Sequence, residues 1–87
     1  NGYQHNVNFI GIVKHQSSKN SLIQVKNPIQ SGSTYIAISP NGNYSTLTNI
    51  TCQTLTHNPT PLLNPNECGW INQSLSQNSL IIQQQNK

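Results

Sequence analysis

The stretch TYIAISPNGNYSTLTNITCQTLT, residues 34–56, decides the fold. Residues 34–39 are rich in aromatic and β-branched side chains, which favour a strand. Pro40 presets φ for a tight turn, and Gly42 can adopt positive φ at no steric cost. Residues 44–56 then alternate regularly, which predicts a returning strand. We therefore expect a hairpin, with one side facing water because neither face of the returning strand is strongly apolar.

Two further strands are predicted before this hairpin and one after it. Residues 7–15 are apolar on both faces, which is typical of a central strand or of one inserted between partners. Gly11 predicts a bulge or a close approach by another backbone. Residues 21–26 should pair with this strand, and Pro28 ends the run. The last strand begins at residues 80–82.

A short helix is predicted near residues 65–76. Asn64 could cap it, and Glu67 occupies the capping-box position. An apolar stripe at helical spacing follows, formed by Cys68, Ile71 and Leu75. The predicted architecture is one mainly β, antiparallel domain over residues 1–87, with five or six strands and loose ends at 1–6 and 84–87. A sandwich and an open barrel fit the pattern equally.

Cys52 and Cys68 are the only cysteines. An even count in a short chain predicts a disulfide and an oxidising compartment. It would stabilise the fold by about 3 kcal/mol in the chain-entropy model. The alternative is two separate buried thiols in a cytosolic domain. Two cysteines make a poor zinc site, and no metal is expected.

The chain is polar without being charged. Only 6% of its 87 residues are charged, against about 25% in an average soluble domain. This composition favours a secreted, periplasmic or cell-surface protein. No apolar run approaches the roughly 18–20 residues that cross a membrane, so a membrane would be reached only through a segment not present in this chain.

The net charge of +3 comes from four lysines and one glutamate, with no arginine. These charges are too few for a phosphate-binding surface, so no nucleic-acid partner is expected. We find no phosphate loop or other cofactor motif and expect no cofactor. A protein partner or self-assembly is the expected interaction.

The histidines suggest the least favoured function, a small secreted hydrolase of the ribonuclease type. His15 and His57, with Lys14, could supply an acid, a base and an oxyanion stabiliser. Surface histidines are the simpler interpretation, because the spacing is not diagnostic and carboxylates are nearly absent. A three-histidine metal site with His5 would lack a carboxylate to orient the rings. An enzyme is therefore not expected.

Exposed aromatic and apolar residues are the candidates for partner contacts. They are Tyr35, Tyr44, Trp70, Val7 and Phe9. Three Asn-X-Ser/Thr sequences could accept N-glycans if the host glycosylates the chain, at Asn43, Asn49 and Asn72. Such matches also arise by chance in an Asn-rich chain.

Residues 36–42 and 48–52 together resemble the β-domain of minor pilins, whose N-terminal hydrophobic helix has no counterpart here. The resemblance implies a subunit of a surface appendage. With the low charge and the open strand edges, it leads to our first hypothesis, a non-enzymatic, extracytoplasmic structural or interaction domain of a cell-surface appendage or envelope assembly. The alternative is a monomeric secreted or periplasmic binding or inhibitor module with one aromatic patch.

Overall fold

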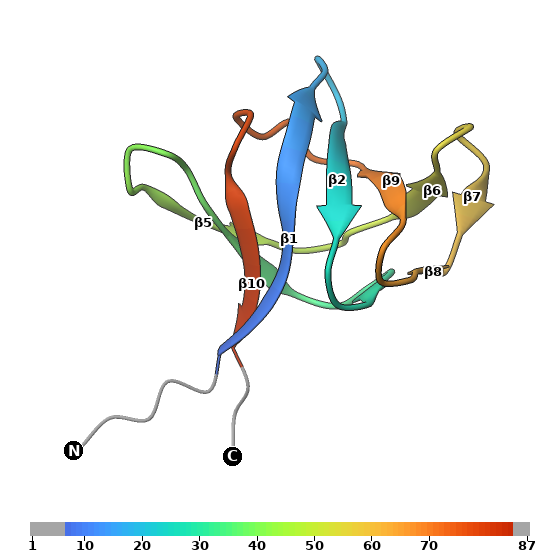
Figure 1. Ribbon diagram of the computed structural model, residues 1–87, viewed down its shortest axis with the longest axis horizontal. Coiled ribbons are helices and arrows are strands. Elements are labelled where there is room, and N and C mark those ends of the chain that lie inside the picture. Colours follow the sequence, from blue (N-terminus) through green and yellow to red (C-terminus); the bar gives the residue numbers. More distant parts are fainter. Residues whose placement is uncertain (1–6, 85–87) are drawn as a thin grey trace.

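A computed structural model describes residues 7–84 as ten β-strands, with no helix in that range. The strands are β1 (Val7–Gln16), β2 (Ser21–Val25), β3 (Ile29–Gln30), β4 (Tyr35–Ile38), β5 (Tyr44–Leu47), β6 (Cys52–Thr54), β7 (Pro59–Thr60), β8 (Leu62–Leu63), β9 (Cys68–Ile71) and β10 (Leu80–Gln84). Eight form one antiparallel sheet in the order β5-β4-β10-β1-β2-β9-β6-β7, and β3 pairs with β8 (Figure 1). The mainly β, antiparallel prediction is confirmed, with more strands than the five or six expected.

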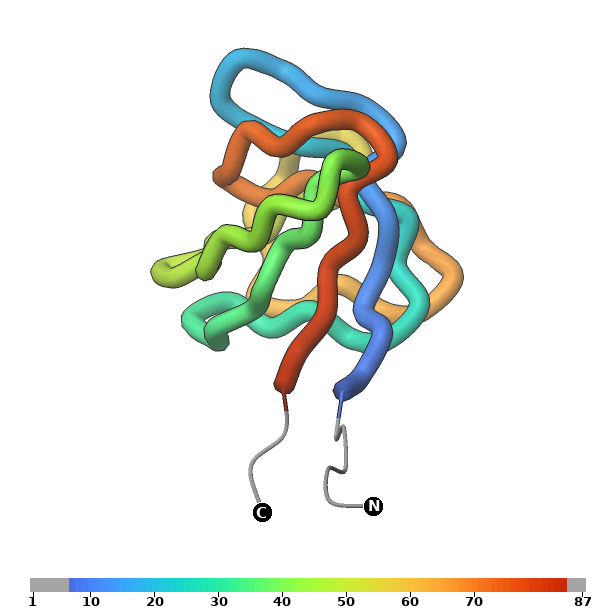
Figure 2. Tube along the Cα trace, turned by 90° about the vertical axis from the view of Figure 1, so that its left-hand side faces the viewer, coloured from blue at the N-terminus to red at the C-terminus, as the bar shows by residue number. Residues whose placement is uncertain are grey.

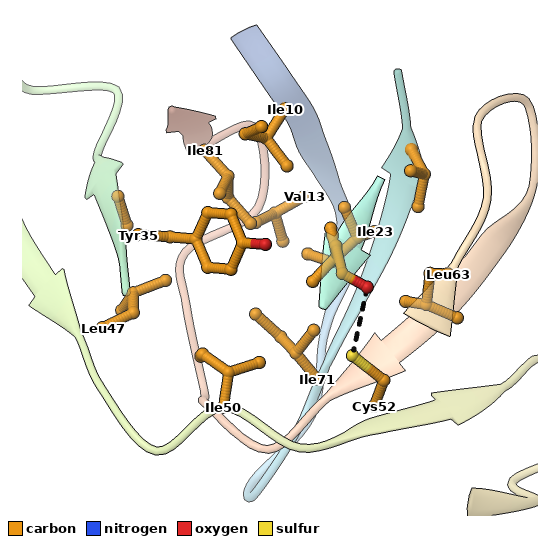
Figure 3. Packing of buried hydrophobic residues seen from close by; sticks show 13 residues of the cluster. Ile10, Val13, Ile23, Tyr35, Leu47, Ile50, Cys52, Leu63, Ile71 and Ile81 are labelled. Carbon is orange, nitrogen blue, oxygen red and sulfur yellow. Dashed lines mark hydrogen bonds between the residues drawn. The ribbon is translucent and has the colours of Figure 1, made fainter. Parts of the chain in front are cut away.

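The large sheet curls around one core (Figures 1 and 2). The buried side chains come from its inner face, from the β3–β8 ribbon and from Ile50 (Figure 3). The two end strands, β5 and β7, are not paired with each other. The large sheet is therefore not closed.

β1 contains the bulge that Gly11 predicted. Phe9 pairs with Ile82 and Gly11 with Ile81, so Ile10 is the extra residue. A side chain at Gly11 would meet the carbonyl oxygen of Gln24, 2.6 Å from an ideal Cβ. The bulge shifts the alternation by one residue. Regular alternation along 7–15 would place Phe9 and Val13 on one face, but Phe9 is exposed, whereas Val13 is buried.

The predicted hairpin is confirmed in β4 and β5. Gly42 has a φ of 91°, and the Ser39 amide donates to the Asn43 carbonyl over 2.9 Å to close the turn. The returning strand is shorter than predicted. It breaks near Asn49, which has a φ of 54°, and resumes as β6. The break moves the chain from the edge strand β5 to β6, next to the strand at the opposite edge.

The helix predicted near residues 65–76 is absent, and β9 lies within that range, between β2 and β6. The capping interaction does form, with the Asn64 amide donating to Oε1 of Glu67 over 3.0 Å. However, it closes a turn in which Asn66 has a φ of 71°. The following residues gain ladder hydrogen bonds on both sides, and this tertiary pairing overrides the weak helical pattern.

The predicted disulfide is also wrong, because both cysteines are free. Cys52 on β6 lies opposite Ile71 on β9, so Cys68 is three residues further along that strand. Three residues span about 10 Å, and an odd offset places the side chains on opposite faces. Cys52 is buried and Cys68 is exposed. The two thiols cannot meet without moving the strands.

The ends of the described chain lie side by side, since Val7 pairs with Gln84. Gln84, predicted to be loose, belongs to β10. The other predicted loose residues, 1–6 and 85–87, lie outside the described residues, as does His5.

Candidate interaction surfaces

The side of the sheet turned away from the core carries a continuous apolar area over β4, β10 and β1. Alternate residues of these strands, such as Tyr35, Ala37 and Ile81, are buried in the core. The residues between them therefore point outward. We name their apolar members the apolar outer face: Phe9, Ile12, Ile36, Ile38, Tyr44, Leu80 and Ile82.

The strand register aligns these residues in two cross-strand rows. One row runs Tyr44, Ile38, Leu80, Ile12, and the next runs Thr46, Ile36, Ile82, Phe9. Directly opposed side chains in such rows are in contact distance. Tyr44 is 70% exposed, Phe9 39% and Leu80 38%, and the four isoleucines are half-buried. Val7, 43% exposed, extends the area along β1.

No charged residue belongs to β4, β5 or β10. Lys14 lies at the end of β1, and Lys19 lies in the β1–β2 turn. Lys26 follows β2, and Glu67 precedes β9. Lys14, at the end of β1, is therefore the only charged residue on the strands that carry the apolar outer face.

A second cluster lies on the outward side of β2, β9 and β6, centred on Trp70. A cross-strand row runs His15, Leu22, Trp70, Gln53. The His57 ring stacks on the Trp70 ring, with centroids 4.7 Å apart and planes at 22°. The His15 ring meets it edge-on at 6.4 Å. The fold thus brings together His15, His57 and Trp70, which are far apart in sequence.

The polar groups of this Trp70 cluster bond within the protein. Nδ1 of His57 lies 3.1 Å from Oε1 of Gln53, and Nε1 of Trp70 donates to the Leu55 carbonyl over 3.2 Å. The Glu67 carboxylate accepts from the Asn64 amide in the β8–β9 turn. Within residues 7–84, no three metal-binding side chains gather. The arrangement provides an aromatic surface made by Trp70 and two histidine rings.

The five predicted contact residues lie in three different places. Phe9 and Tyr44 belong to the apolar outer face and Val7 extends it, whereas Trp70 centres the second cluster. Tyr35 is a correction: it is 2% exposed, and its hydroxyl accepts a hydrogen bond from the Gln30 amide over 2.9 Å. Its ring fills the core because it occupies an inward position of β4.

The three glycosylation sequences lie in exposed positions. Asn43 follows the β4–β5 turn, and Asn49 occupies the break before β6. The Asn72 side chain accepts from the Thr51 amide over 2.9 Å and donates to the Asn49 carbonyl over 3.1 Å. Asn72 therefore already has a structural role, as a brace between β9 and this break.

Sequence reasoning missed most of the apolar outer face, which includes Ile36, Ile38, Leu80 and Ile82. The signal was present, because residues 35–38 and 80–82 carry apolar side chains at both alternating positions. A strand of this kind is either covered on both sides or presents an apolar face. Only the strand order shows that nothing within residues 7–84 covers the outer side.

No family model matches this chain, and no curated protein matches it. Two solved structures do. Both are crystal structures of the C-terminal domain of a Geobacillus thermoleovorans "putative U32 peptidase", one of them a selenomethionine variant. The selenomethionine form aligns with a TM-score of 0.76 over 86% of this chain and 98% of its own. The other aligns with a TM-score of 0.77 over 91% and 93%.

Sequence identity to both structures is 15%. At that level the similarity establishes a shared fold and nothing about chemistry. The alignment covers almost all of each chain, so the curled sheet as a whole is shared.

Proposed function

We propose that this chain is a non-enzymatic interaction domain that binds a protein partner through its apolar outer face. One observation carries the proposal: seven apolar side chains, all exposed or half-buried, lie in two adjacent rows that contain no charged residue. Large contiguous apolar patches on a soluble surface mark interaction sites. Isolated exposed apolar residues, such as Leu55 on its own, carry no such meaning.

The face has the composition of an interface core. Charged residues are depleted at the centres of protein interfaces, and aromatic residues are enriched. Here Phe9 and Tyr44 are the aromatic members and Lys and Glu are absent. We expect the energetic centre near Leu80, which is flanked by Ile38 and Ile12 in its row.

We further propose that the domain works outside the cytoplasm, within a cell-surface or envelope assembly. The scarcity of charge and the resemblance to minor pilins support this location. The free cysteines remove the disulfide argument for it. The matched solved structures are a domain of a larger protein, which fits a role as an attached binding unit.

A second candidate function has its own observation. His15 and His57 both contact the half-buried Trp70. An aromatic surface of this kind favours the alternative of a monomeric binding module. It also gives the hydrolase hypothesis a location, although Glu67, the chain's sole acid, is hydrogen-bonded in the β8–β9 turn.

Site-specific photo-crosslinking tests the proposed function. A photoreactive phenylalanine analogue replaces Leu80 in one chain and Leu55 in another, and both are expressed in the native host. Leu55 is the matched control because it is exposed, apolar and outside the apolar outer face. We expect a discrete crosslinked product from position 80 and little from position 55. Absence of a product at position 80, or equal products at both, would overturn the proposal.

A further inference from the structure

The two edges of the large sheet differ in how they are protected. β7 has only two residues, begins with Pro59 and is followed by Pro61. Proline and short length are devices that block edge pairing. β5 has four residues, with no proline, no charge and no irregularity in its register with β4. β5 is therefore the edge open to a further strand (Figure 1).

The turn geometry shows which backbone groups of β5 are free. Ser39 and Asn43 form a hydrogen-bonded pair at the turn, because the Ser39 amide donates to the Asn43 carbonyl. Hydrogen-bonded and non-hydrogen-bonded pairs alternate along an antiparallel ladder. Ser45 therefore bonds to β4, whereas the N–H and C=O groups of Tyr44 and Thr46 point away from it. Neither residue has another backbone partner within residues 7–84.

We propose that β5 pairs in an antiparallel fashion with β5 of a second copy of this chain. Identical antiparallel strands can pair around a two-fold axis. Using the outward groups, Tyr44 pairs with the partner subunit's Thr46, and Ser45 faces the partner subunit's Ser45 across the axis. In this register the Tyr44 ring packs against a threonine, a favourable cross-strand combination.

The charge distribution favours a second copy as the occupant. Two copies of a chain with net charge +3 repel each other wherever their lysines approach. The lysines within residues 7–84 lie at the end of β1, in the β1–β2 turn and after β2, and none lies on β4 or β5. As far as residues 7–84 are concerned, two copies can thus meet at the β5 edge without opposing their lysines.

Pairing at this edge would place both apolar outer faces on the same side of a continuous sheet. A two-fold axis through the Ser45 pair runs perpendicular to the sheet, so the outward sides stay aligned. The dimer would present two adjacent copies of the face, and binding to a repeated partner would be bivalent. This inference is independent of the proposed function, since the edge can pair whether or not the face binds another protein.

A disulfide trap tests the register in chains that carry Cys68→Ser to remove the exposed thiol. Ser45→Cys is the test variant, and Asn41→Cys, in the exposed turn, is the matched control. Non-hydrogen-bonded pairs have Cα atoms about 4.5 Å apart, within the range of a disulfide. Under mild oxidation we expect a covalent dimer of the Ser45→Cys chain in large excess over the control. No dimer, or equal amounts from both, would overturn the inference.

Proline at position 46 tests the same pairing without a crosslink. The Thr46 N–H points away from β4, so Thr46→Pro removes the intermolecular donor and spares the hairpin. Thr46→Lys, which adds like charges at the edge, is the second variant if proline disturbs folding. We expect a light-scattering mass that rises toward the dimer with concentration for the unmodified chain, and a folded monomer for the variants. An unmodified chain that stays monomeric, or a folded variant that still dimerises, would contradict the inference. Photo-crosslinking from position 80 tests the proposed function separately.

Discussion

At the scale of single residues, two glycines and two cysteines explain where the chain departs from its apparent patterns. Gly11 and Gly69 allow neighbouring groups to approach the backbone closely, with an ideal Cβ at Gly69 only 2.9 Å from the Gln53 carbonyl oxygen. The Leu63 side chain lies against the same position. A glycine that weakens a predicted helix therefore serves as a contact point between β9, β6 and β8.

Gly69→Ala should destabilise the fold by about 1–3 kcal/mol, because overpacking forces the Leu63 side chain and the backbone apart. Gly32→Ala is the control: nothing lies within 4 Å of its Cβ, and only its φ of 87° is unfavourable to alanine. Urea unfolding curves would measure both. A smaller loss at Gly69 than at Gly32 would contradict the packing described for β9.

The two thiols should differ sharply in reactivity. Cys68 is exposed and Cys52 buried. A thiol reagent should therefore label Cys68 rapidly in the native protein, and Cys52 only after unfolding. Peptide mass spectrometry would locate the label. If neither the native nor the denatured protein were labelled in the absence of a reductant, the result would contradict the free thiols and support a disulfide.

Burial raises the pKa of the Cys52 thiol, although a hydrogen bond with Ser31 opposes the shift. The folded state therefore keeps this thiol protonated at pH values where the unfolded chain ionises it. The resulting stability is present below the ordinary thiol pKa and is lost as pH rises through the raised value. Between about pH 7 and about pH 10, the unfolding free energy of the native chain should fall more than that of Cys52→Ala. An equal fall in both would contradict this.

At the scale of elements, periodicity predicted the strands well and their limits poorly. The 7–15, 21–26 and 34–39 strands and the tight turn at Gly42 all appear, because local alternation and turn chemistry determine them. The helix was predicted because Cys68, Ile71 and Leu75 fit a helical stripe. The prediction failed because residues 68–71 pair with a strand on each side. Which strands become neighbours depends on long-range pairing, so the apolar outer face could not be read from one strand at a time.

The break between β5 and β6 is a further element that only the structure shows. Asn72→Ala should cost about 0.5–1.5 kcal/mol, because it removes the exposed hydrogen bonds to the Thr51 amide and the Asn49 carbonyl, which water then replaces only in part. Asn72→Asp is the graded control, since it keeps the acceptor for Thr51 and loses the donor to Asn49. Thermal unfolding should rank native above Asp above Ala. Equal stability of all three chains would show that the brace is dispensable.

At the scale of the whole molecule, the two sides of one curled sheet have different roles. The inner side and the β3–β8 ribbon enclose the core. The outer side of β4, β10 and β1 is also apolar, and folding leaves its members exposed or half-buried. Leu80→Lys should therefore lower the thermal unfolding temperature of the isolated chain only modestly, because Leu80 is 38% exposed, whereas Ile81→Lys, one residue away and 1% exposed, should abolish folding.

The most direct measurement of the central claim is a covalent footprint of the apolar outer face in two states. A carbene reagent would label the purified chain and the same chain within its native assembly, and mass spectrometry would compare the sites. We predict that Phe9, Tyr44 and Leu80 are labelled in the purified chain and protected in the assembly, while Leu55 is labelled in both. Equal labelling of the face in the two states would contradict its role as the interaction surface.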